Sequence, residues 1–235
     1  IWEQAQLPLI GAGVLLLPGA ILALLEISRQ NKWRYLGGLF WVVGMMLIYA
    51  WRLPVTYQHG RYLIPMMPVF FVWGMAGVFQ MQQRNAGLPV RRILARAWLA
   101  ALFALQFGFL YLGAKSYAQD VAFIESEMVK TARWVSEHTV ADEIVAAHDI
   151  GALGYFSGRE LVDLAGLVSP EVIPFLRAEN HLSQYLSEKG VDYLVTFPGW
   201  YPQLAAEAEL VYTTGEGFSL QQGGENMAVF RWFAK

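Results

Sequence analysis

The charged residues of this chain divide it into two unlike halves. Residues 1–116 contain ten Lys or Arg and two acidic residues, whereas residues 117–235 contain seven basic and seventeen acidic ones. The overall net charge of -2 therefore conceals a basic, strongly apolar first half and an acidic second half. Such an asymmetry is typical of a chain whose two parts lie in different environments. We predict a transmembrane domain over residues 1–116 and a separate domain over residues 117–235.

Four long apolar stretches occur in the first half, and each is close to the roughly 20 residues that a helix needs to cross a bilayer. They cover residues 7–27, 33–53, 62–81 and 95–114. Seven of the ten basic residues lie outside the stretches, and the other three, Arg34, Arg52 and Arg96, lie one residue inside the end of a stretch. Aromatic residues gather toward the ends of the stretches, where rings prefer the headgroup region. We therefore predict four transmembrane helices. The alternative is that the stretches are buried helices of a soluble protein, which the distribution of the charges disfavours.

The basic residues between the stretches predict the orientation of the membrane domain. Seven lie on one face, in the segments 28–34 and 84–96, and three lie on the other. The positive-inside rule assigns the face with seven basic residues to the cytoplasm. The loop at residues 54–61 and everything after Lys115 are then extracytoplasmic, in a multi-pass protein of the cell membrane. The absence of Cys fits that compartment but does not require it, because a domain of this size can form a core without disulfides.

The second half predicts one small α/β domain. Residues 120–138 have apolar side chains at three- and four-residue spacing, which indicates an amphipathic helix. Five runs have the composition of strands, and two further segments have that of helices. The strands are expected at residues 143–147, 161–164, 191–197, 209–213 and 227–233, and the helices at 169–176 and 181–189. This alternation favours a largely parallel sheet with a C-terminal hairpin. The predicted fold class is a membrane all-α part with four transmembrane helices, followed by a small extracytoplasmic α/β domain.

A polar patch lies at the expected outer end of the third apolar stretch. His59, Arg61 and Tyr62 offer hydrogen-bond donors there, at the depth of the lipid headgroups. A guanidinium binds a phosphate or carboxylate through two parallel hydrogen bonds, so these residues are a candidate site for a lipid-linked phosphate. The alternative is that Arg61 only extends its charged end to the interface while the aromatic rings anchor the helix.

A second candidate site follows the first two predicted strands. His148 and Asp149 end the first strand, and Asp163 ends the next on what is expected to be the same edge of the sheet. These side chains suit the hydroxyls of a sugar or a divalent cation. The alternative is that both Asp residues cap turns and helices and that His148 is a hydrogen-bonded, partly buried imidazole. A His-Asp dipeptide alone is no metal motif, so no metal is assigned.

An aromatic turn follows the third predicted strand, at residues 197–202. It is expected to pack on its own domain or on the membrane, or to stack on a sugar ring. The acidic charge of the second half disfavours nucleic acid as a partner.

The run Arg61-Tyr62-x-x-Pro65-x-x-Pro68 opens a late apolar stretch, and one more stretch and the α/β tail follow it. This arrangement resembles the C-terminal region of bacterial GT-C glycosyltransferases, the polytopic family that includes the protein mannosyltransferases and the aminoarabinose transferases. Residues 148–156 and 163–167 also look like the tails of bacterial members. The resemblance covers most of the chain.

The resemblance implies inverting transfer of a sugar from a polyprenyl-phosphate donor to an acceptor on the outer face of the membrane. It implies that Arg61 stabilises the charge on the leaving phosphate, with His59 and Tyr62 as further donors. In the family the catalytic Asp lies in the first outer loop, near the N-terminus, and no residue here inherits that role. Because the chain begins at Ile1 without an initiator Met, we expect a fragment that lacks this loop.

Two other functions stay open at this point. One is a non-enzymatic envelope protein, in which the helices anchor an outer domain that binds a glycan or a partner subunit. The other is a transporter of lipid or oligosaccharide. For the transferase, the expected partners are membrane lipid and a polyprenyl-phosphate sugar, and a divalent cation is the one cofactor that the sequence leaves open.

Overall fold

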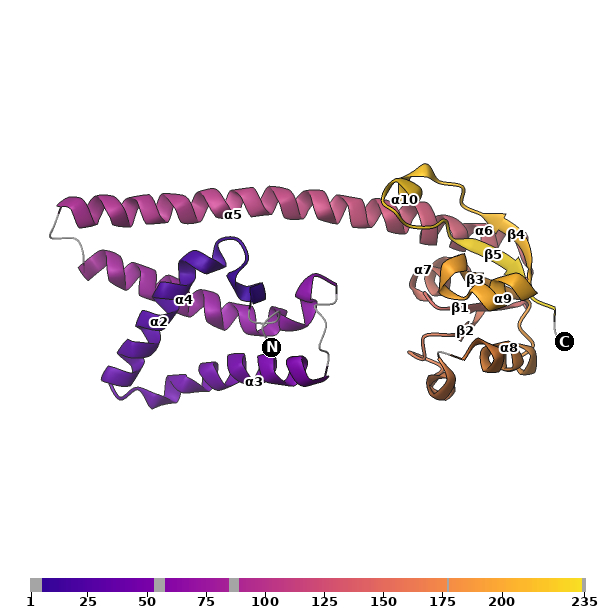
Figure 1. The fold of residues 1–235 in the computed structure, drawn as a ribbon, viewed down its shortest axis with the longest axis horizontal. Coiled ribbons are helices and arrows are strands. Elements are labelled where there is room, and N and C mark those ends of the chain that lie inside the picture. Colours follow the sequence, from indigo (N-terminus) through magenta and orange to yellow (C-terminus); the bar gives the residue numbers. More distant parts are fainter. Residues whose placement is uncertain (1–5, 53–57, 85–88, 177, 234–235) are drawn as a thin grey trace. The chain divides into compact units, whose positions relative to one another are not determined.

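The computed structural model describes residues 6–52, 58–84, 89–176 and 178–233. The chain divides into two compact units, Ile1–Ala114 and Lys115–Lys235 (Figure 1). The first unit is helical, and the second combines helices with a five-stranded sheet. The long helix α5, Pro89–Phe123, begins in the first unit, and its last residues belong to the second.

The first three helices of the helical unit begin later than the apolar stretches that predict them. A 3-10 turn, Leu7–Leu9, precedes the first of them, and Gly11 in between has a φ of 67°, a left-handed conformation that glycine adopts without strain. Two more 3-10 segments, Trp33–Leu36 and Gln58–Met66, precede the second and the third. The helices are α2, Gly13–Arg29; α3, Gly37–Arg52; and α4, Met67–Arg84.

The prediction of four transmembrane helices is wrong for the part of the chain that the structure describes. Two helical segments there are long and apolar enough to cross a membrane, Arg61–Gln83 and Pro89–His138. They contain the predicted stretches 62–81 and 95–114. α2 has 17 residues and α3 has 16. At 1.5 Å per residue they reach about 26 Å and about 24 Å, short of the roughly 30 Å of hydrocarbon. The 3-10 turns before them take up residues that the hydropathy pattern assigns to the spans.

α2 and α4 cross at a contact built from glycine. A Cβ atom added to Gly77 would lie 1.9 Å from the carbonyl oxygen of Gly19, and one added to Gly19 would lie 2.1 Å from that of Gly74. Small residues of this kind let helix backbones approach closely in membrane proteins. Beside the crossing, Leu16 and Val78 are buried in the apolar cluster of this unit.

The second unit begins with the continuation of α5. The helix passes through a π-helical segment, Ile124–Val129, into α6, Lys130–His138. The prediction of a helix over residues 120–138 is therefore confirmed, but its hydrogen bonding changes partway along. A π-helical turn holds an extra residue, so the face that each later side chain occupies is shifted relative to a regular α-helix.

The sheet has the strand order β2-β1-β3-β5-β4. Each strand begins and ends within two residues of a predicted one. The strands are β1, Ile144–Ala147; β2, Glu160–Asp163; β3, Tyr193–Thr196; β4, Glu209–Thr213; and β5, Ala228–Arg231. β1 pairs in parallel with β2 and β3, whereas β5 pairs antiparallel with β3 and β4. The prediction of a largely parallel sheet is therefore wrong: the sheet is mixed, because the last strand inserts between β3 and β4.

Short helices connect the strands and cover both faces of the sheet. The predicted helix at residues 169–176 is a 3-10 helix, Pro170–Phe175. The predicted helix at residues 181–189 is the α-helix α8, Glu179–Glu188. The α-helices after α6 are α7, Gly151–Phe156; α8, Glu179–Glu188; α9, Pro202–Glu207; and α10, Gly217–Gln221.

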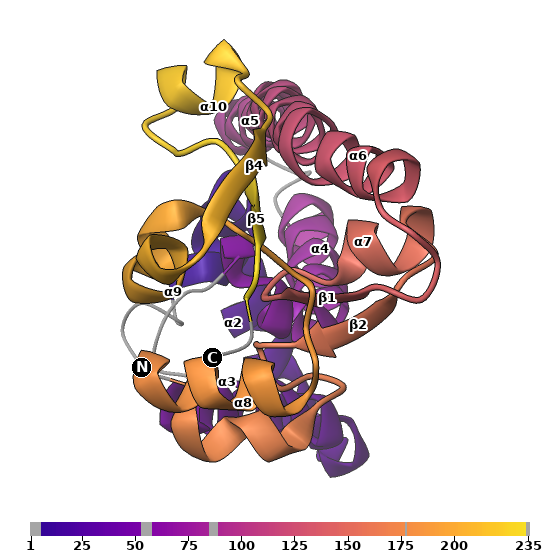
Figure 2. The ribbon, with the colours of Figure 1, turned by 90° about the vertical axis from the view of Figure 1, so that its right-hand side faces the viewer.

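Apolar side chains alternate between the two faces along the central strands, as strand geometry requires. Val145 and Val195 pack with α6 and α7 on one face. Ala146 and Leu194 pack with α8 and α9 on the other. Figure 2 shows α6 and α7 on one side of the sheet and α8 and α9 on the opposite side. The unit is thus a three-layer α/β/α fold with a buried sheet.

Arg159 fastens the end of α6 to the start of β2. Its guanidinium donates hydrogen bonds to the hydroxyl of Thr139 at 2.8 Å and to the carbonyl oxygens of Thr139, Ser136 and Ser157 at 2.7, 2.8 and 3.0 Å. The carbonyls at the end of a helix lack partners within the helix, so an arginine in this position stabilises the terminus.

β4 lies at one edge of the sheet, and its pairing with β5 is irregular. The register shifts between Leu210 and Tyr212, which leaves Val211 as the extra residue of a bulge. Four of the five residues of β4 are exposed, so this edge faces away from the core of the second unit.

Candidate functional site

The topology of the second unit singles out one place where a ligand can bind. The chain leaves β1 toward α7 on one face of the sheet and leaves β3 toward α9 on the other face. β1 and β3 are neighbours and parallel, so their carboxyl ends lie at the same edge. Where neighbouring strands of an open α/β sheet send their connections to opposite faces, a crevice forms at the carboxyl ends, and ligands bind there.

Three aromatic residues meet at these strand ends. His148 follows β1, and its Nδ1 lies 2.7 Å from the hydroxyl oxygen of Tyr201, in the segment after β3. The edge of the His148 ring also meets the Trp200 ring, with 5.0 Å between the ring centres. Tyr201 is buried, His148 is half-buried, and 49 % of Trp200 is exposed. Phe197 also lies 5.0 Å from the centre of the Trp200 ring, so the exposed half of Trp200, beside a fixed imidazole, is the part that a ligand can contact.

The Tyr201 hydroxyl keeps its proton at all physiological pH values. Burial, together with the nearby carboxylates of Glu179 and Asp163, which disfavour a further negative charge, raises its pKa to about 12. Tyr201 can therefore donate to Nδ1 of His148, and in that arrangement Nε2 is the ring nitrogen left to contact a ligand.

Asp163 and Asp149, which the sequence groups with His148, have different environments. The carboxylate of Asp163 is fully buried and accepts hydrogen bonds from the amides of Ala165 and Val168, both at 2.7 Å. Asp163 therefore fixes the turn after β2, as the alternative to ligand binding predicts for this residue. Asp149 is half-buried, and no residue that the structure describes donates a hydrogen bond to its carboxylate. Of the two, Asp149 is the one available to a ligand.

The described residues contain no group of three or more His, Cys, Asp or Glu placed to hold a metal ion. In the crevice, His148, Trp200 and Asp149 can contact a ligand through aromatic rings and hydrogen bonds. Its residues suit a ligand with hydroxyl groups and an apolar face, such as a sugar ring.

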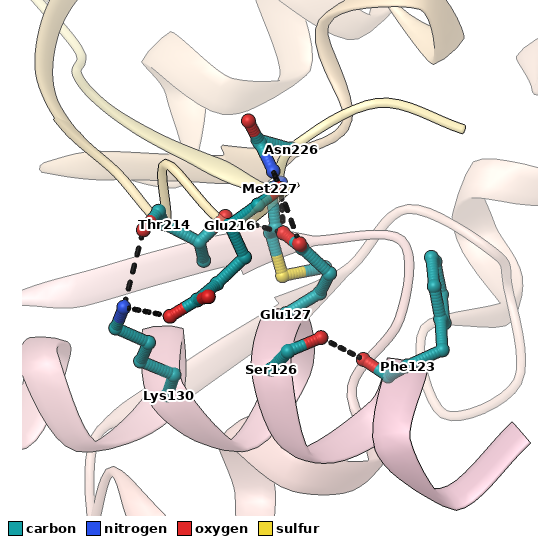
Figure 3. A network of polar contacts seen from close by, with 8 residues as sticks. All are labelled: Phe123, Ser126, Glu127, Lys130, Thr214, Glu216, Asn226 and Met227. Atoms are coloured by element: carbon teal, nitrogen blue, oxygen red, sulfur yellow. Dashed lines mark hydrogen bonds and ion pairs between the residues drawn. The ribbon is translucent and has the colours of Figure 1, made fainter. Parts of the chain in front are cut away.

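A buried carboxylate occupies the π-helical segment on another part of this unit. Glu127 accepts hydrogen bonds from the Thr214 hydroxyl, from the Met227 amide at 2.7 Å and from the Asn226 side chain at 3.1 Å (Figure 3). One turn further on, Lys130 binds Glu216 at 2.5 Å and the carbonyl oxygen of Thr214 at 3.1 Å. All of Glu127's partners lie beyond residue 213, so the network ties the incoming helix to the C-terminal segment.

A polar groove of about 590 Å³ runs beside this network. Its walls include Lys130, Glu216, Arg133 and the stacked pair Trp134 and Tyr212, whose ring centres are 4.7 Å apart. Trp134 also stacks on His138, with 4.7 Å between the ring centres, so this indole already has two aromatic partners within the chain. We assign the network a structural role in holding the helix.

Arg61 in the first unit lies against an aromatic pair. Its Nη2 donates to the hydroxyl of Tyr62 at 3.2 Å, and its guanidinium lies 5.1 Å from the centre of that ring. The Tyr62 ring in turn stacks on Tyr49 at 5.4 Å. Arg61 itself is exposed, so its remaining donors are accessible. The side chain of His59, the third residue predicted for this site, lies outside the described part of the chain.

Sequence reasoning missed Tyr201 and Trp200 as partners of His148, although the aromatic turn at residues 197–202 was visible. It also missed Glu127. The signal for Glu127 is its spacing: it lies three residues after Ile124, close to the apolar face of the predicted helix, where a carboxylate needs partners.

Residues 115–230 match the model of a family described as a domain of unknown function, DUF8728. The match falls within the second unit. No curated protein and no solved structure matches the chain at a significant level. The description of that family names no activity.

Proposed function

We propose that the chain is the C-terminal part of an integral membrane glycosyltransferase of the GT-C type. It takes a sugar from a polyprenyl-phosphate donor on the outer face of the membrane. No residue of this sequence is assigned a catalytic role. The observation that carries the proposal is Arg61, an exposed guanidinium fixed against Tyr62 at the start of an apolar helix.

The membrane location is supported by the two long apolar helices, Arg61–Gln83 and Pro89–His138. Residues 84–96, which include the connection between them and the first residues of the second helix, contain four arginines and no acid. The positive-inside rule favours a cytoplasmic location for this segment. In the proposed multi-pass topology, Arg61 and the second unit then lie on the extracytoplasmic side.

Arg61 has the chemistry that a lipid-linked donor requires. The polyprenyl tail lies in the hydrocarbon, so its phosphate stays at the interface, where a cation at the end of a helix can reach it. Tyr62 holds one side of the guanidinium, and the accessible donors can bind two phosphate oxygens in parallel. In the transferase, this contact stabilises the charge that develops on the leaving phosphate.

In this proposal the second unit binds the acceptor. The crevice with His148, Trp200 and Asp149 has hydrogen-bonding groups beside an exposed indole. Aromatic faces bind the apolar face of a sugar, and polar side chains around them bind its hydroxyls. A non-enzymatic envelope protein, with an anchored unit that binds a glycan, is the second candidate, because the same crevice alone supports it.

The first experiment has two readouts. One is binding of a polyprenyl phosphate to this chain in detergent, and the other is sugar transfer by the longer protein of which the chain is proposed to be the C-terminal part. Arg61→Ala is expected to reduce turnover about a hundredfold, as loss of a group that stabilises transition-state charge does. Arg61→Lys keeps the charge but loses the planar fork, so a smaller loss is expected. Arg52→Ala, an exposed arginine at the end of α3, is the matched control. Equal binding and turnover in wild type and Arg61→Ala would leave Arg61 as an interfacial anchor only.

The second experiment tests the orientation by fusion of a topology reporter. A reporter after Lys235 is expected to be active only outside the cytoplasm, and one inserted at Asn85 only inside. The reverse result would remove the donor site from the outer face.

A further inference from the structure

A small cavity lies between the end of α4 and the beginning of α5, and Arg61 is not among its lining residues. It has a volume of about 250 Å³ and is lined by Val78, Met81, Gln82, Arg91, Leu94, Ala95 and Trp98. Apolar side chains form most of its wall, whereas Arg91 and Gln82 supply the polar groups. The cavity thus combines a surface for a hydrocarbon chain with one positive charge.

The wall of the cavity is fixed on one side and open on the other. Trp98 donates from its indole nitrogen to the carbonyl oxygen of Leu15 at 3.2 Å, and Gln82 donates to that of Ala95 at 3.4 Å. Val78 is buried. Leu94 and Arg91 are exposed, so a ligand can enter past them.

The sequence on both sides of Arg91 is basic. Arg84, Arg91, Arg92 and Arg96 lie within 13 residues of sequence, and no acidic residue occurs between Glu26 and Asp120. Glu26 lines a different cavity, which it shares with α4 residues such as Trp73. The chemistry that fits is an anion with an apolar tail. A free phosphate would leave the apolar wall without a partner, and a neutral lipid would leave the charge of Arg91 without one.

We infer that this cavity binds an anionic phospholipid of the membrane, with the phosphate at Arg91 and one acyl chain against Val78, Leu94 and Trp98. Basic pockets between membrane helices on the cytoplasmic side bind anionic headgroups in this way. The site is separate from the donor phosphate at Arg61, and it would exist in a transferase, an anchor or a transporter alike. It requires only that these two helices lie in a bilayer.

The test compares lipid retention by the full chain in detergent micelles. Phosphatidylglycerol and phosphatidylcholine with identical acyl chains are added, and the bound lipid is counted by native mass spectrometry. Wild type is expected to bind phosphatidylglycerol more tightly. Arg91→Gln is expected to lower that preference about fivefold, since one basic residue near an anionic lipid contributes about that factor. Leu94→Ser changes an exposed position, so the protein should fold, and it is expected to weaken binding of both lipids.

Arg29→Gln is the matched control, because it removes a charge from the same predicted face at the end of α2 without touching the cavity. An equal loss in Arg29→Gln and Arg91→Gln would show a general effect of net charge and overturn the inference. Inorganic phosphate supplies the second arm. If it displaces phosphatidylglycerol at equal concentration, the site recognises a free anion, and the lipid assignment is wrong.

Discussion

Glu127 offers the sharpest test of how the second unit is held together. Its side chain is fully buried, and both carboxylate oxygens accept hydrogen bonds from the C-terminal segment. Glu127→Ala removes the acceptor but leaves the Met227 amide and the Thr214 hydroxyl in place. Both donors are buried, at 2 % and 6 % exposure, so water replaces the carboxylate poorly.

The expected cost follows from these two orphaned donors. A buried donor without a partner costs about 1–3 kcal/mol. Two of them, together with the lost side-chain packing, give about 4 kcal/mol for Glu127→Ala, a large part of the 5–15 kcal/mol that typically stabilises a domain. Glu127→Gln keeps the shape and one carbonyl oxygen, which can still accept from Met227 and Thr214. Its expected cost is about 1–2 kcal/mol, because hydrogen bonds to a neutral acceptor are weaker.

Urea unfolding of the full chain in mild detergent, followed by circular dichroism, measures the loss. Hydrogen exchange of the Met227 amide gives a local readout, and we expect it to accelerate sharply in Glu127→Ala. Glu125→Ala, an exposed position in the same π-helical segment, is the control and should change stability by less than about 0.5 kcal/mol. If Glu127→Ala unfolds within about 1 kcal/mol of wild type and Met227 stays protected, the reasoning about unsatisfied donors is refuted.

Three further predictions follow from other contacts. Gly77→Ala should separate α2 from α4 and so destabilise the first unit by about 1–3 kcal/mol, which thermal unfolding measures. Gly44→Ala is the control: open space surrounds Gly44, so this change should be neutral or slightly stabilising. Arg159→Lys should cost about 2–3 kcal/mol in urea unfolding because one ammonium cannot reach all four acceptors, and Arg133→Lys should cost far less. Because the pKa of Tyr201 is raised from 10.0 to about 12, stability should be full below pH 10 and fall as the pH rises toward 12, by at most about 2.7 kcal/mol. Tyr201→Phe should remove this part of the pH profile, and an unchanged profile would contradict the assignment.

The elements of the second unit could be predicted because each strand carries its own local signal. β3, Tyr193–Thr196, is a run of aromatic, aliphatic and β-branched residues that is buried throughout. The antiparallel pairing of β4 with β5 agrees with the predicted C-terminal hairpin. The pairing of β5 with β3 could not be predicted, since β5 has the same local pattern whether it joins the edge or inserts between β3 and β4. Strand order depends on contacts between distant segments, which composition does not encode.

In the first unit the opposite holds: composition indicated apolar helices, but not where they begin. The composition of residues 33–36 is the same in a 3-10 turn as in an α-helix, so the sequence pattern does not separate them from the span. For the candidate site, His148 and Asp149 were visible as polar residues at a strand end. Tyr201, the partner of His148, lies 53 residues away in the sequence, and only the fold brings the two together.

The bulge in β4 has a consequence for how the second unit behaves in solution. An edge strand with regular backbone geometry is a template on which a strand from another molecule can pair, and such pairing leads to aggregation. The extra residue at Val211 breaks the regular spacing of amide and carbonyl groups along β4 and strengthens the local twist. Glu209 adds a negative charge at the start of the same edge. A second copy of the sheet therefore finds no continuous row of partners there, and this edge protects the unit from growing into a larger sheet at high concentration.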